Sequence, residues 1–186
     1  MTVRWSCRQR HWQQKRYVLT LEYYHLINHL VHHYRPNYLS ININVATILT
    51  KEFDRFIDKQ KQLADKPIIL EISLFDIMSD LPEYFSAQKK IEAIGCKICI
   101  CRMDIQSLYV LDRELINVDF LKFRWQKSYL TSLTESEKKK VNDAIAAIGK
   151  MRVVMSDCDS TNAIRFGKSI GVMMFQGFEV DKLQGL

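Results

Sequence analysis

The stretch Pro67-Ile-Ile-Leu-Glu-Ile-Ser73 is a short, almost continuous apolar run, and an amphipathic segment follows it. The same unit recurs along the chain, with five further runs at Tyr38 to Val45, Cys96 to Cys101, Val118 to Phe123, Met151 to Ser156 and Val172 to Phe178. A strand that is apolar throughout is typical of a parallel sheet covered by helices. The pattern therefore predicts the α/β class with about six parallel strands.

The segments between the runs carry helix signals. Apolar residues recur at helical spacing in them, and caps or stops mark their ends. Helices are expected at Leu19 to Tyr34, from Thr50 onward, at Asp80 to Ile94 before Gly95, near Ile105 to Leu115, from the capping box Thr134 to Glu137 up to Gly149, and from Ser160 to Gly171.

A barrel suits this alternation better than a dinucleotide-binding fold, because no Gly-rich phosphate loop opens any of the helices. A closed barrel of this kind needs eight strands. We therefore expect an incomplete TIM-like (β/α) barrel over residues 19–186, after a basic segment at residues 1–18. Either Lys15 to Leu21 adds a partial strand, or a second copy of the chain closes the gap as a homodimer.

The positive charge is concentrated at the N-terminus. The net charge is +6, but residues 1–16 hold five basic residues and no acid, which leaves 22 basic against 21 acidic residues in the remainder. With Trp5 and Trp12 interleaved, this segment suits either phosphate and base contacts or packing of its tryptophans on the barrel. We favour the packing role, and do not expect nucleic acid to be the partner.

The hydropathy and the cysteine content of the chain indicate its cellular location. No window reaches the length of uninterrupted apolar sequence that crosses a bilayer, and Arg4, Arg8 and Arg10 stand where a signal peptide would be apolar. Five cysteines without framework spacing indicate reduced thiols. We predict a cytoplasmic protein that does not bind a membrane.

Two patterns resemble metal motifs. Cys96, Cys99 and Cys101 lie in a strand-like run, where alternation turns Cys96 away from the other two, so buried thiols are expected there rather than zinc. The helical triplet His25, His29 and His32 has no carboxylate or cysteine in its helix to complete a site, so a solvated face is expected. We predict no metal and no cofactor.

The residues at the ends of the runs form an ordered set. They include Asn44-Val45-Ala46, Glu71-Ile72-Ser73, Cys101-Arg102-Met103-Asp104, Lys122, Met155-Ser156-Asp157-Cys158-Asp159 and Gln176-Gly177-Phe178. In order and spacing this set resembles an EAL domain, the barrel that hydrolyses cyclic di-GMP with divalent metal. The resemblance runs from the third to the eighth strand of that family, over about residues 20 to 182, and is nearest to degenerate EAL-like proteins of alphaproteobacteria.

The resemblance assigns a role to each position. Asn44 and Glu71 stand where the family places metal ligands, and Lys122 stands where its lysine helps to activate water. Cys101 and Arg102 replace two aspartates, Ser156 replaces a glutamate, Asp159 shortens another, and Gln176 matches the closing Gln-Gly-Tyr. The Glu-Ala-Leu motif itself is absent from the sequence. The vestigial positions are thus Asn44, Glu71, Cys101, Arg102, Lys122, Ser156, Asp159 and Gln176.

Two divalent ions in phosphodiester hydrolysis require clustered carboxylates, and the permanent charge of Arg102 repels a cation. We therefore predict a catalytically inactive EAL-like module that acts in signalling or regulation through a protein partner or homodimer.

Three alternatives remain. The first is a sensor that binds cyclic di-GMP or another nucleotide without cleavage through Asn44, Arg102, Lys122 and Gln176. The second is a rebuilt hydrolase that uses Glu71, Asp104, Asp157 and Asp159. The third is nucleic-acid binding through the basic segment, with strong salt dependence.

Overall fold

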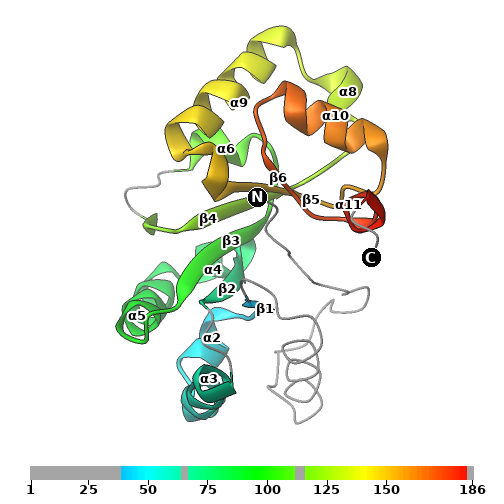
Figure 1. Cartoon of the computed structure of the whole chain (residues 1–186). Coiled ribbons are helices and arrows are strands. Elements are labelled where there is room, and N and C mark those ends of the chain that lie inside the picture. The colour runs from blue at the N-terminus through cyan, green and yellow to red at the C-terminus, as the bar shows by residue number, and fades with distance from the viewer. Residues whose placement is uncertain (1–38, 64–66, 112–115, 184–186) are drawn as a thin grey trace. The chain divides into compact units, whose positions relative to one another are not determined.

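The computed structural model describes residues 39–63, 67–111 and 116–183. The basic segment at residues 1–18, the helix expected at Leu19 to Tyr34 and the partial strand at Lys15 to Leu21 lie outside these ranges. The chain divides into two compact units, with the division between Ile98 and Cys99 (Figure 1).

Strands and helices alternate along the chain. The strands are β1 (Leu39–Asn42), β2 (Ile68–Ser73), β3 (Lys97–Met103), β4 (Phe120–Arg124), β5 (Val153–Ser156) and β6 (Met174–Phe175), and their order across the sheet follows the sequence. The pairs β1–β2, β3–β4, β4–β5 and β5–β6 are parallel. This sequential order confirms the expected class, an incomplete TIM-like (β/α) barrel of six strands with outer helices.

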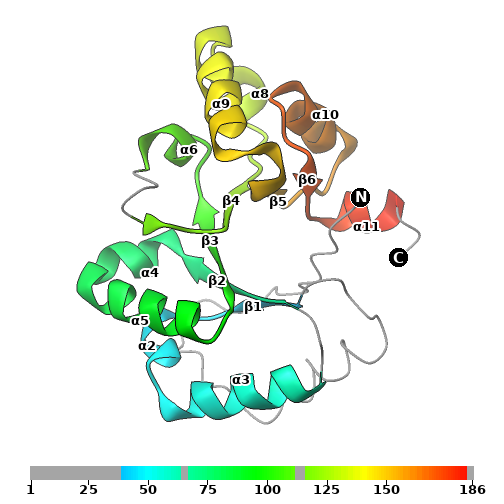
Figure 2. The same ribbon diagram turned by 60° about the vertical axis from the view of Figure 1, so that its left-hand side comes forward.

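The first unit packs helices α2 (Val45–Ile48), α3 (Lys51–Leu63), α4 (Leu74–Ser79) and α5 (Leu81–Ala93) with β1 and β2. Figure 2 shows α3 and α5 as its two long helices. Phe53 and Ile57 of α3 are buried, and so are Tyr84 and Ile91 of α5. Helix α3 begins as expected, because Phe53 N donates to Thr50 Oγ1 at 3.2 Å.

An ion pair joins α3 to α5. Lys90 Nζ lies 2.7 Å from Asp54 Oδ1 and donates to Thr50 O at 3.2 Å. The Gly95 stop after α5 is confirmed, since its φ of +70° is a left-handed conformation that glycine adopts without cost.

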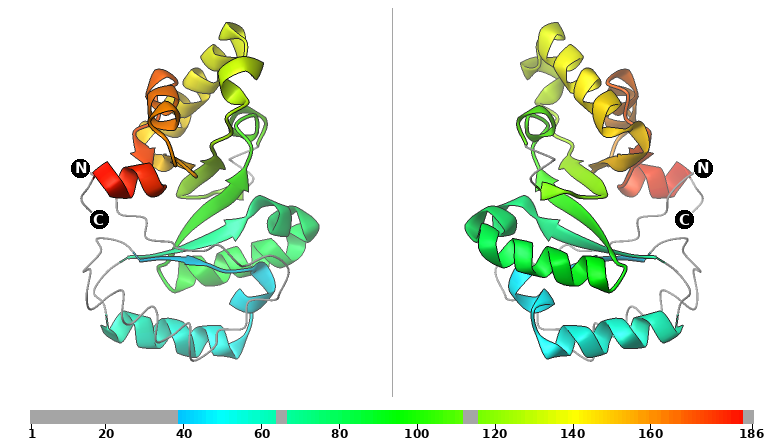
Figure 3. Two further views of the ribbon diagram at one scale, coloured as in Figure 1. Left: turned by 90° about the vertical axis from the view of Figure 1, so that its right-hand side faces the viewer. Right: turned by 90° about the vertical axis from the view of Figure 1, so that its left-hand side faces the viewer.

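The second unit joins β4 to β6, and β3 from Cys99 onward, with α6 (Ser107–Val110), α8 (Tyr129–Ser132), α9 (Glu135–Ile148), α10 (Thr161–Ser169) and α11 (Phe178–Leu183). Both views in Figure 3 show α10 next to β6. The capping box of α9 is confirmed, because Thr134 Oγ1 accepts from Glu137 N at 3.2 Å and Glu137 Oε2 accepts from Thr134 N at 2.8 Å. Ser160 caps α10, and Gly149 and Gly171 have positive φ at the helix ends, as expected.

Several boundaries differ from the sequence expectation. The run at Val172 to Phe178 contains only a two-residue strand, because Phe178 already begins α11. The helix expected at Ile105 to Leu115 is limited to Ser107–Val110 in the described residues. A short 3₁₀ helix at Lys150–Arg152 precedes β5, where a strand was expected from Met151.

The first run ends its strand at Asn42 rather than Val45. The reason is local: Asn44 accepts a hydrogen bond from the backbone of Thr47 and so starts α2. No helix in the described ranges combines the length and apolar character that a membrane span requires.

Candidate functional site

In the first unit, Glu71 is a buried carboxylate inside a strand. It lies in β2 opposite Asn42 of β1, and its side chain is 4% exposed. Ser40 Oγ of β1 donates to Glu71 Oε1, and Ile43 N donates to Glu71 O at 3.0 Å. The neighbouring strand therefore solvates this carboxylate with a hydroxyl group, which lowers the cost of burying its charge.

The side chain of Asn44 forms a hydrogen bond with the backbone of the first unit. Its side-chain oxygen Oδ1 accepts a hydrogen bond from Thr47 N at 2.9 Å and caps α2. Val45 N in the same turn donates to Asp76 Oδ2 of α4 at 2.6 Å. The amide oxygen that the resemblance assigns to a metal is thus committed to a helix cap.

In the second unit, the two positions that replace aspartates lie at an irregularity in β3. The register with β4 shifts between Ile100 and Met103, and Arg102 between them has a φ of +58°. Cys101 is a buried thiol, whereas Arg102 is exposed. A bulge of this kind redirects a side chain, and here it turns the guanidinium to the surface.

Lys122 and Ser156 are polar residues buried in β4 and β5. Lys122 is 4% exposed and Ser156 is 8% exposed. The register pairs Lys122 with Val154 and Arg124 with Ser156. Ser156 Oγ donates to Phe123 O at 3.2 Å, so its hydroxyl proton goes to the neighbouring strand.

The carboxylates in the loops that follow the strands each accept a hydrogen bond from another segment. Asp104 Oδ1 accepts from Gln126 Nε2 at 3.0 Å, and Asp157 Oδ2 accepts from Arg124 Nε at 2.8 Å. Asp159 Oδ1 accepts from Phe178 N at 2.9 Å, at the start of α11. We call these three contacts the loop ties. Each joins a different pair of segments, so each of the three carboxylates is oriented by its own separate partner.

Gln176 lies where β6 ends, beside the turn after β5. Gln176 N donates to Met155 O at 2.9 Å, and Cys158 N donates to Gln176 O at 3.0 Å. Gly177 has a φ of +150°, and an added Cβ would stand 2.7 Å from Cys158 C. The close approach of these backbones requires glycine at this position.

Cys158 is an inert thiol rather than a nucleophile. It is fully buried, and its Sγ donates to Met155 O at 3.3 Å. Burial raises the pKa of the Cys158 thiol to about 12. The thiol therefore stays protonated near neutral pH. Cys96, Cys99 and Cys101 are also buried.

The donor set does not fit the two divalent ions that the fold family implies. Magnesium and calcium favour several oxygen ligands, and carboxylates in particular. The vestigial positions of the second unit offer instead a thiol, a guanidinium, an ammonium and a hydroxyl, from Cys101, Arg102, Lys122 and Ser156. Asp159 there bonds a backbone amide. Within the described residues no three Asp, Glu, His or Cys side chains gather as metal ligands.

The sequence did not single out Ser40 or Arg124. The alternation of β1 places Ser40 on the face that it shares with Glu71, and this became visible only once the strand register was known. Arg124 follows Lys122 by two residues, so both belong to one face of β4.

No protein-family model matches the sequence, and no curated protein matches it. Solved structures do resemble the fold. A Bacillus subtilis YkuI structure, which has an EAL domain in complex with its substrate cyclic di-GMP and calcium, is 14% identical with a TM-score of 0.62. That match covers 83% of this chain and 40% of the YkuI chain.

Two further structures give the same answer. Klebsiella pneumoniae BlrP1, in a complex with manganese and cyclic di-GMP, has a TM-score of 0.68 at 13% identity, over 84% of this chain and 42% of its own. The FimX EAL domain of Pseudomonas aeruginosa, bound to cyclic di-GMP, has a TM-score of 0.61 at 16% identity, over 83% of this chain and 65% of its own.

This chain spans less than two thirds of the length of each of these three structures. The likeness nevertheless extends over more than four fifths of its own residues. Taken with the sequential strand order and the alternating helices, it identifies the architecture: this chain has the fold of an EAL domain.

Proposed function

We propose that this chain is a catalytically inactive EAL-like module that acts in signalling or regulation by binding a protein partner or a second copy of itself. The observation that carries the proposal is the loop ties. Asp104, Asp157 and Asp159 each bond a different partner at the carboxyl ends of the strands. These carboxylates are the ones a rebuilt metal site in the second unit would need.

The chemistry of the reaction explains why this matters. Metal-assisted cleavage of a phosphodiester needs two cations that hold the attacking and leaving oxygens, and each cation needs converging oxygen ligands. Moving Asp159 toward a metal would release the amide of Phe178 at the start of α11. Moving Asp157 would release Arg124, whose positive charge also opposes a cation. The rebuilt hydrolase is therefore disfavoured.

An exposed apolar surface in the first unit supports a role in protein binding. Phe75 is 82% exposed and Met78 is 57% exposed, and they lie three residues apart on α4. Residues at that spacing share one face of a helix. Large exposed apolar side chains that adjoin one another are typical of interaction surfaces.

A second candidate function is a sensor that binds cyclic di-GMP without cleaving it. The solved neighbours YkuI, BlrP1 and FimX were each captured with this nucleotide. The observation that favours the sensor is the pair of cations on β4, Lys122 and Arg124, since fixed cations can bind phosphate without metal. Asn44, Arg102 and Gln176 complete the residues predicted to contact the ligand.

The test of both candidates is a calorimetric titration of the full chain with cyclic di-GMP, with and without magnesium, followed by analysis for the linear product. Heat without product is the result expected of the sensor. No heat and no product is the result expected of a module that acts through protein partners alone. Formation of the linear product that is abolished by Glu71→Ala contradicts inactivity.

The interaction role has its own measurement. Sedimentation of the full chain across a range of concentrations should reveal self-association, and Phe75→Ser should reduce it if α4 carries the contact. The matched control is Leu130→Ser, which removes an apolar side chain at a 43% exposed position in the second unit and should leave self-association unchanged. A stable monomer at every concentration, together with no captured partner, opposes the proposal. A cytoplasmic location and the separate role of residues 1–18 stay predictions.

A further inference from the structure

The segment after β2 in the first unit combines exposed apolar side chains with acids. Phe75 and Met78 are exposed on one face of α4. Asp80 follows α4 directly and is exposed, and its Oδ1 accepts a hydrogen bond from Glu83 N at 2.9 Å in the first turn of α5. Residues 74–83 include three acids and no lysine or arginine. We call Phe75, Met78, Asp80 and Glu83 the acidic face.

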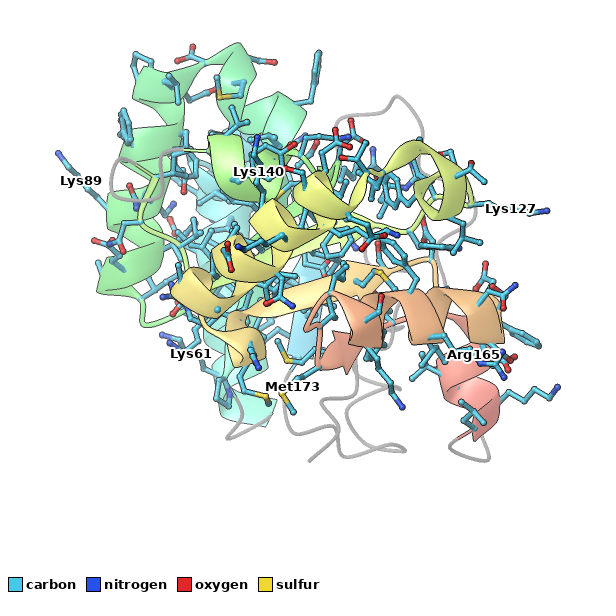
Figure 4. The ribbon with its side chains drawn as sticks, turned by 90° about the horizontal axis from the view of Figure 1, so that it is seen from above. Lys61, Lys89, Lys127, Lys140, Arg165 and Met173 are labelled. Carbon is cyan, nitrogen blue, oxygen red and sulfur yellow. The ribbon has the colours of Figure 1, made fainter. Side chains whose placement is uncertain are left out.

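The second unit exposes two methionines at the amino ends of β5 and β6. Met173 directly precedes β6 and is 62% exposed, and Met151 lies two residues before β5 and is 46% exposed. These strands are parallel, and the register pairs Val154 with Met174. Both methionines therefore belong to the same edge of the sheet. Figure 4 shows the Met173 side chain pointing away from the ribbon.

Basic residues accompany these methionines. Lys150 and Arg152 flank Met151 in the chain, and both are exposed. Arg152 donates to the backbone carbonyl of Asp119 through Nε at 2.9 Å and to that of Val118 through Nη2. Carbonyl groups hold the guanidinium in place without neutralising it, because they carry no net charge.

A third base belongs to the turn that leads into β6. Lys168 is exposed in the last turn of α10, and its carbonyl accepts a hydrogen bond from Gly171 N at 3.2 Å. Residues 144–156 and 160–175 together contain four basic residues and no acid. Asp119 before β4 and Asp143 on α9 reduce this charge without cancelling it. We call Met151, Met173, Lys150, Arg152 and Lys168 the basic face.

The two faces are complementary in their chemistry. Each combines two exposed apolar side chains, which gain free energy when association removes them from water. The charges beside those side chains are opposite in sign, and opposite charges across an interface favour association and fix its register. Two acidic faces, or two basic faces, would instead bring like charges together. Contact between unlike faces is therefore favoured over contact between like faces.

We propose that the acidic face of one copy of this chain docks on the basic face of a second copy. The inference rests on the proposed self-association and names the two surfaces that carry it. A contact between different surfaces leaves one face of each kind free in a dimer, so further copies can add. Self-association should consequently continue beyond the dimer unless a ring closes.

The basic segment at residues 1–16 is the competing occupant of the acidic face, because it has five basic residues and no acid. That contact would cover Phe75 and Met78 but would leave the methionines of the basic face exposed. Docking between copies covers both apolar surfaces in one contact. The two occupants differ in a measurable way, since only docking between copies depends on Met173.

The experiment is sedimentation of the full chain and of two variants, Phe75→Ser and Met173→Ser, across a range of concentrations. Each variant disables one face and should raise the dissociation constant of self-association about tenfold. Leu130→Ser is the matched control and should leave that constant unchanged. All three side chains are exposed, so the urea midpoints of the variants should equal that of wild type.

The charges are tested by Lys150→Glu, which reverses one charge of the basic face and should weaken self-association about tenfold. Lys140→Glu reverses an exposed charge on α9, well separated from Met173 in Figure 4, and is the matched control. High salt should weaken the self-association of wild type as well. Equal effects of the two charge reversals would show that only net charge matters and would overturn the assignment of the basic face.

An equal mixture of the Phe75→Ser and Met173→Ser chains, one of them fluorescently labelled, is decisive. The first chain retains its basic face and the second retains its acidic face, so the mixture contains one intact pair of faces. It should form mixed dimers with the affinity of wild type and should stop at the dimer. A mixture that associates no more tightly than either variant alone overturns the proposal.

The remaining outcomes separate this proposal from the proposed function. Loss of self-association in Phe75→Ser but not in Met173→Ser would assign a different occupant to the acidic face and overturn the pairing. Self-association that neither variant changes would overturn the pairing while leaving a self-associating module in place. A chain that is monomeric at every concentration overturns the pairing too, and the proposed function would then depend on capture of another protein.

Discussion

The two units treat their strand-end carboxylates in opposite ways. In the first unit, Glu71 lies within β2, is buried and accepts a hydrogen bond from Ser40 of the adjacent strand. In the second unit, Asp104, Asp157 and Asp159 follow their strands and bond respectively to a loop residue, to the end of β4 and to the start of α11. The strand fixes the face of the sheet toward which a polar side chain points. A side chain in a loop is not fixed in this way and can form a hydrogen bond with any of several neighbouring segments.

The largest expected effect tests the backbone that supports the second unit. Gly177→Ala should lower the free energy of unfolding by about 3 kcal/mol, because the new methyl group meets the Cys158 backbone and φ is positive. Urea denaturation measures it. Gly95→Ala, where φ is +70° but nothing lies within 4 Å, should cost about 1 kcal/mol. Equal losses in the two variants would show that contact with Cys158 adds nothing.

The next effect tests the buried carboxylate of the first unit. Ser40→Ala removes the hydroxyl that donates to Glu71 and should lower the free energy of unfolding by about 2 kcal/mol. Ser86→Ala, at an exposed site on α5, is the matched control and should change it by less than about 0.5 kcal/mol. If Ser40→Ala is as mild as its control, Glu71 does not depend on β1 and the contrast between the units fails.

A gain in stability is expected at Gln60 of α3. Its amide is fully buried, and neither the nitrogen nor the oxygen finds a hydrogen-bond partner in the described part of the chain. Gln60→Met keeps the length of the side chain and should raise the free energy of unfolding by about 1 kcal/mol. Gln106→Met, at an exposed position, should leave it unchanged. A loss at Gln60 would reveal a polar partner for this amide.

The pH dependence of stability should report Cys158. Burial raises its pKa to about 12 in the folded protein, whereas the unfolded thiol titrates near 9. The unfolded chain therefore loses this proton first, and the stability from the buried thiol is present below about pH 9 and is lost as the pH rises toward 12.

Cys158→Ala should consequently lose less stability than wild type between pH 8 and pH 10, by about 1 kcal/mol. Urea midpoints of both proteins at the two pH values measure this difference. The pKa of Tyr84 and that of Cys96 are also raised, chiefly by burial, but those groups are present in both proteins and cancel in the comparison. Identical pH profiles would contradict the raised pKa of Cys158.

The smallest effect concerns the loop tie of Arg124. Arg124→Gln should change the free energy of unfolding by less than about 0.5 kcal/mol, because both partners are more than half exposed. Thermal or urea unfolding measures it. A larger loss of unfolding free energy would mean that the contact between Arg124 and Asp157 stabilises the fold. The contrast between buried Glu71 and the exposed loop carboxylates would then fail.

The sequence predicted the repeating architecture because its signals are local. Thr50, Thr134 and Ser160 cap helices as expected, and Gly95 and Gly149 end them. Each of these signals acts within one turn of a helix, so no knowledge of the rest of the fold is needed to recognise it.

The details that the sequence did not predict depend on contacts between strands. Arg102 adopts a positive φ without being glycine, so its bulge leaves no compositional signal. Phe178 looked like the end of a strand, but Asp159 accepts a hydrogen bond from its amide and it begins α11. The donation from Ser40 to Glu71 requires the register of β1 against β2.

Order and spacing in the sequence predicted the candidate positions, but not the hydrogen-bond partners of their side chains. The sequence placed Asp104, Asp157 and Asp159 at strand ends, which does not establish that their oxygens converge. The structure assigns Gln126, Arg124 and the Phe178 amide as their respective partners. A carboxylate in a loop has several neighbours within reach, and only coordinates decide among them.

The loop ties also bear on how this chain could change in the future. Placing aspartates at positions 101 and 102 would add two carboxylates, yet the first step would bury a carboxylate at position 101 without a cation to balance it. Asp159 would still be needed at the start of α11. Each such substitution is therefore expected to cost stability before a complete metal site exists to offset it, so a stepwise gain of metal chemistry is opposed.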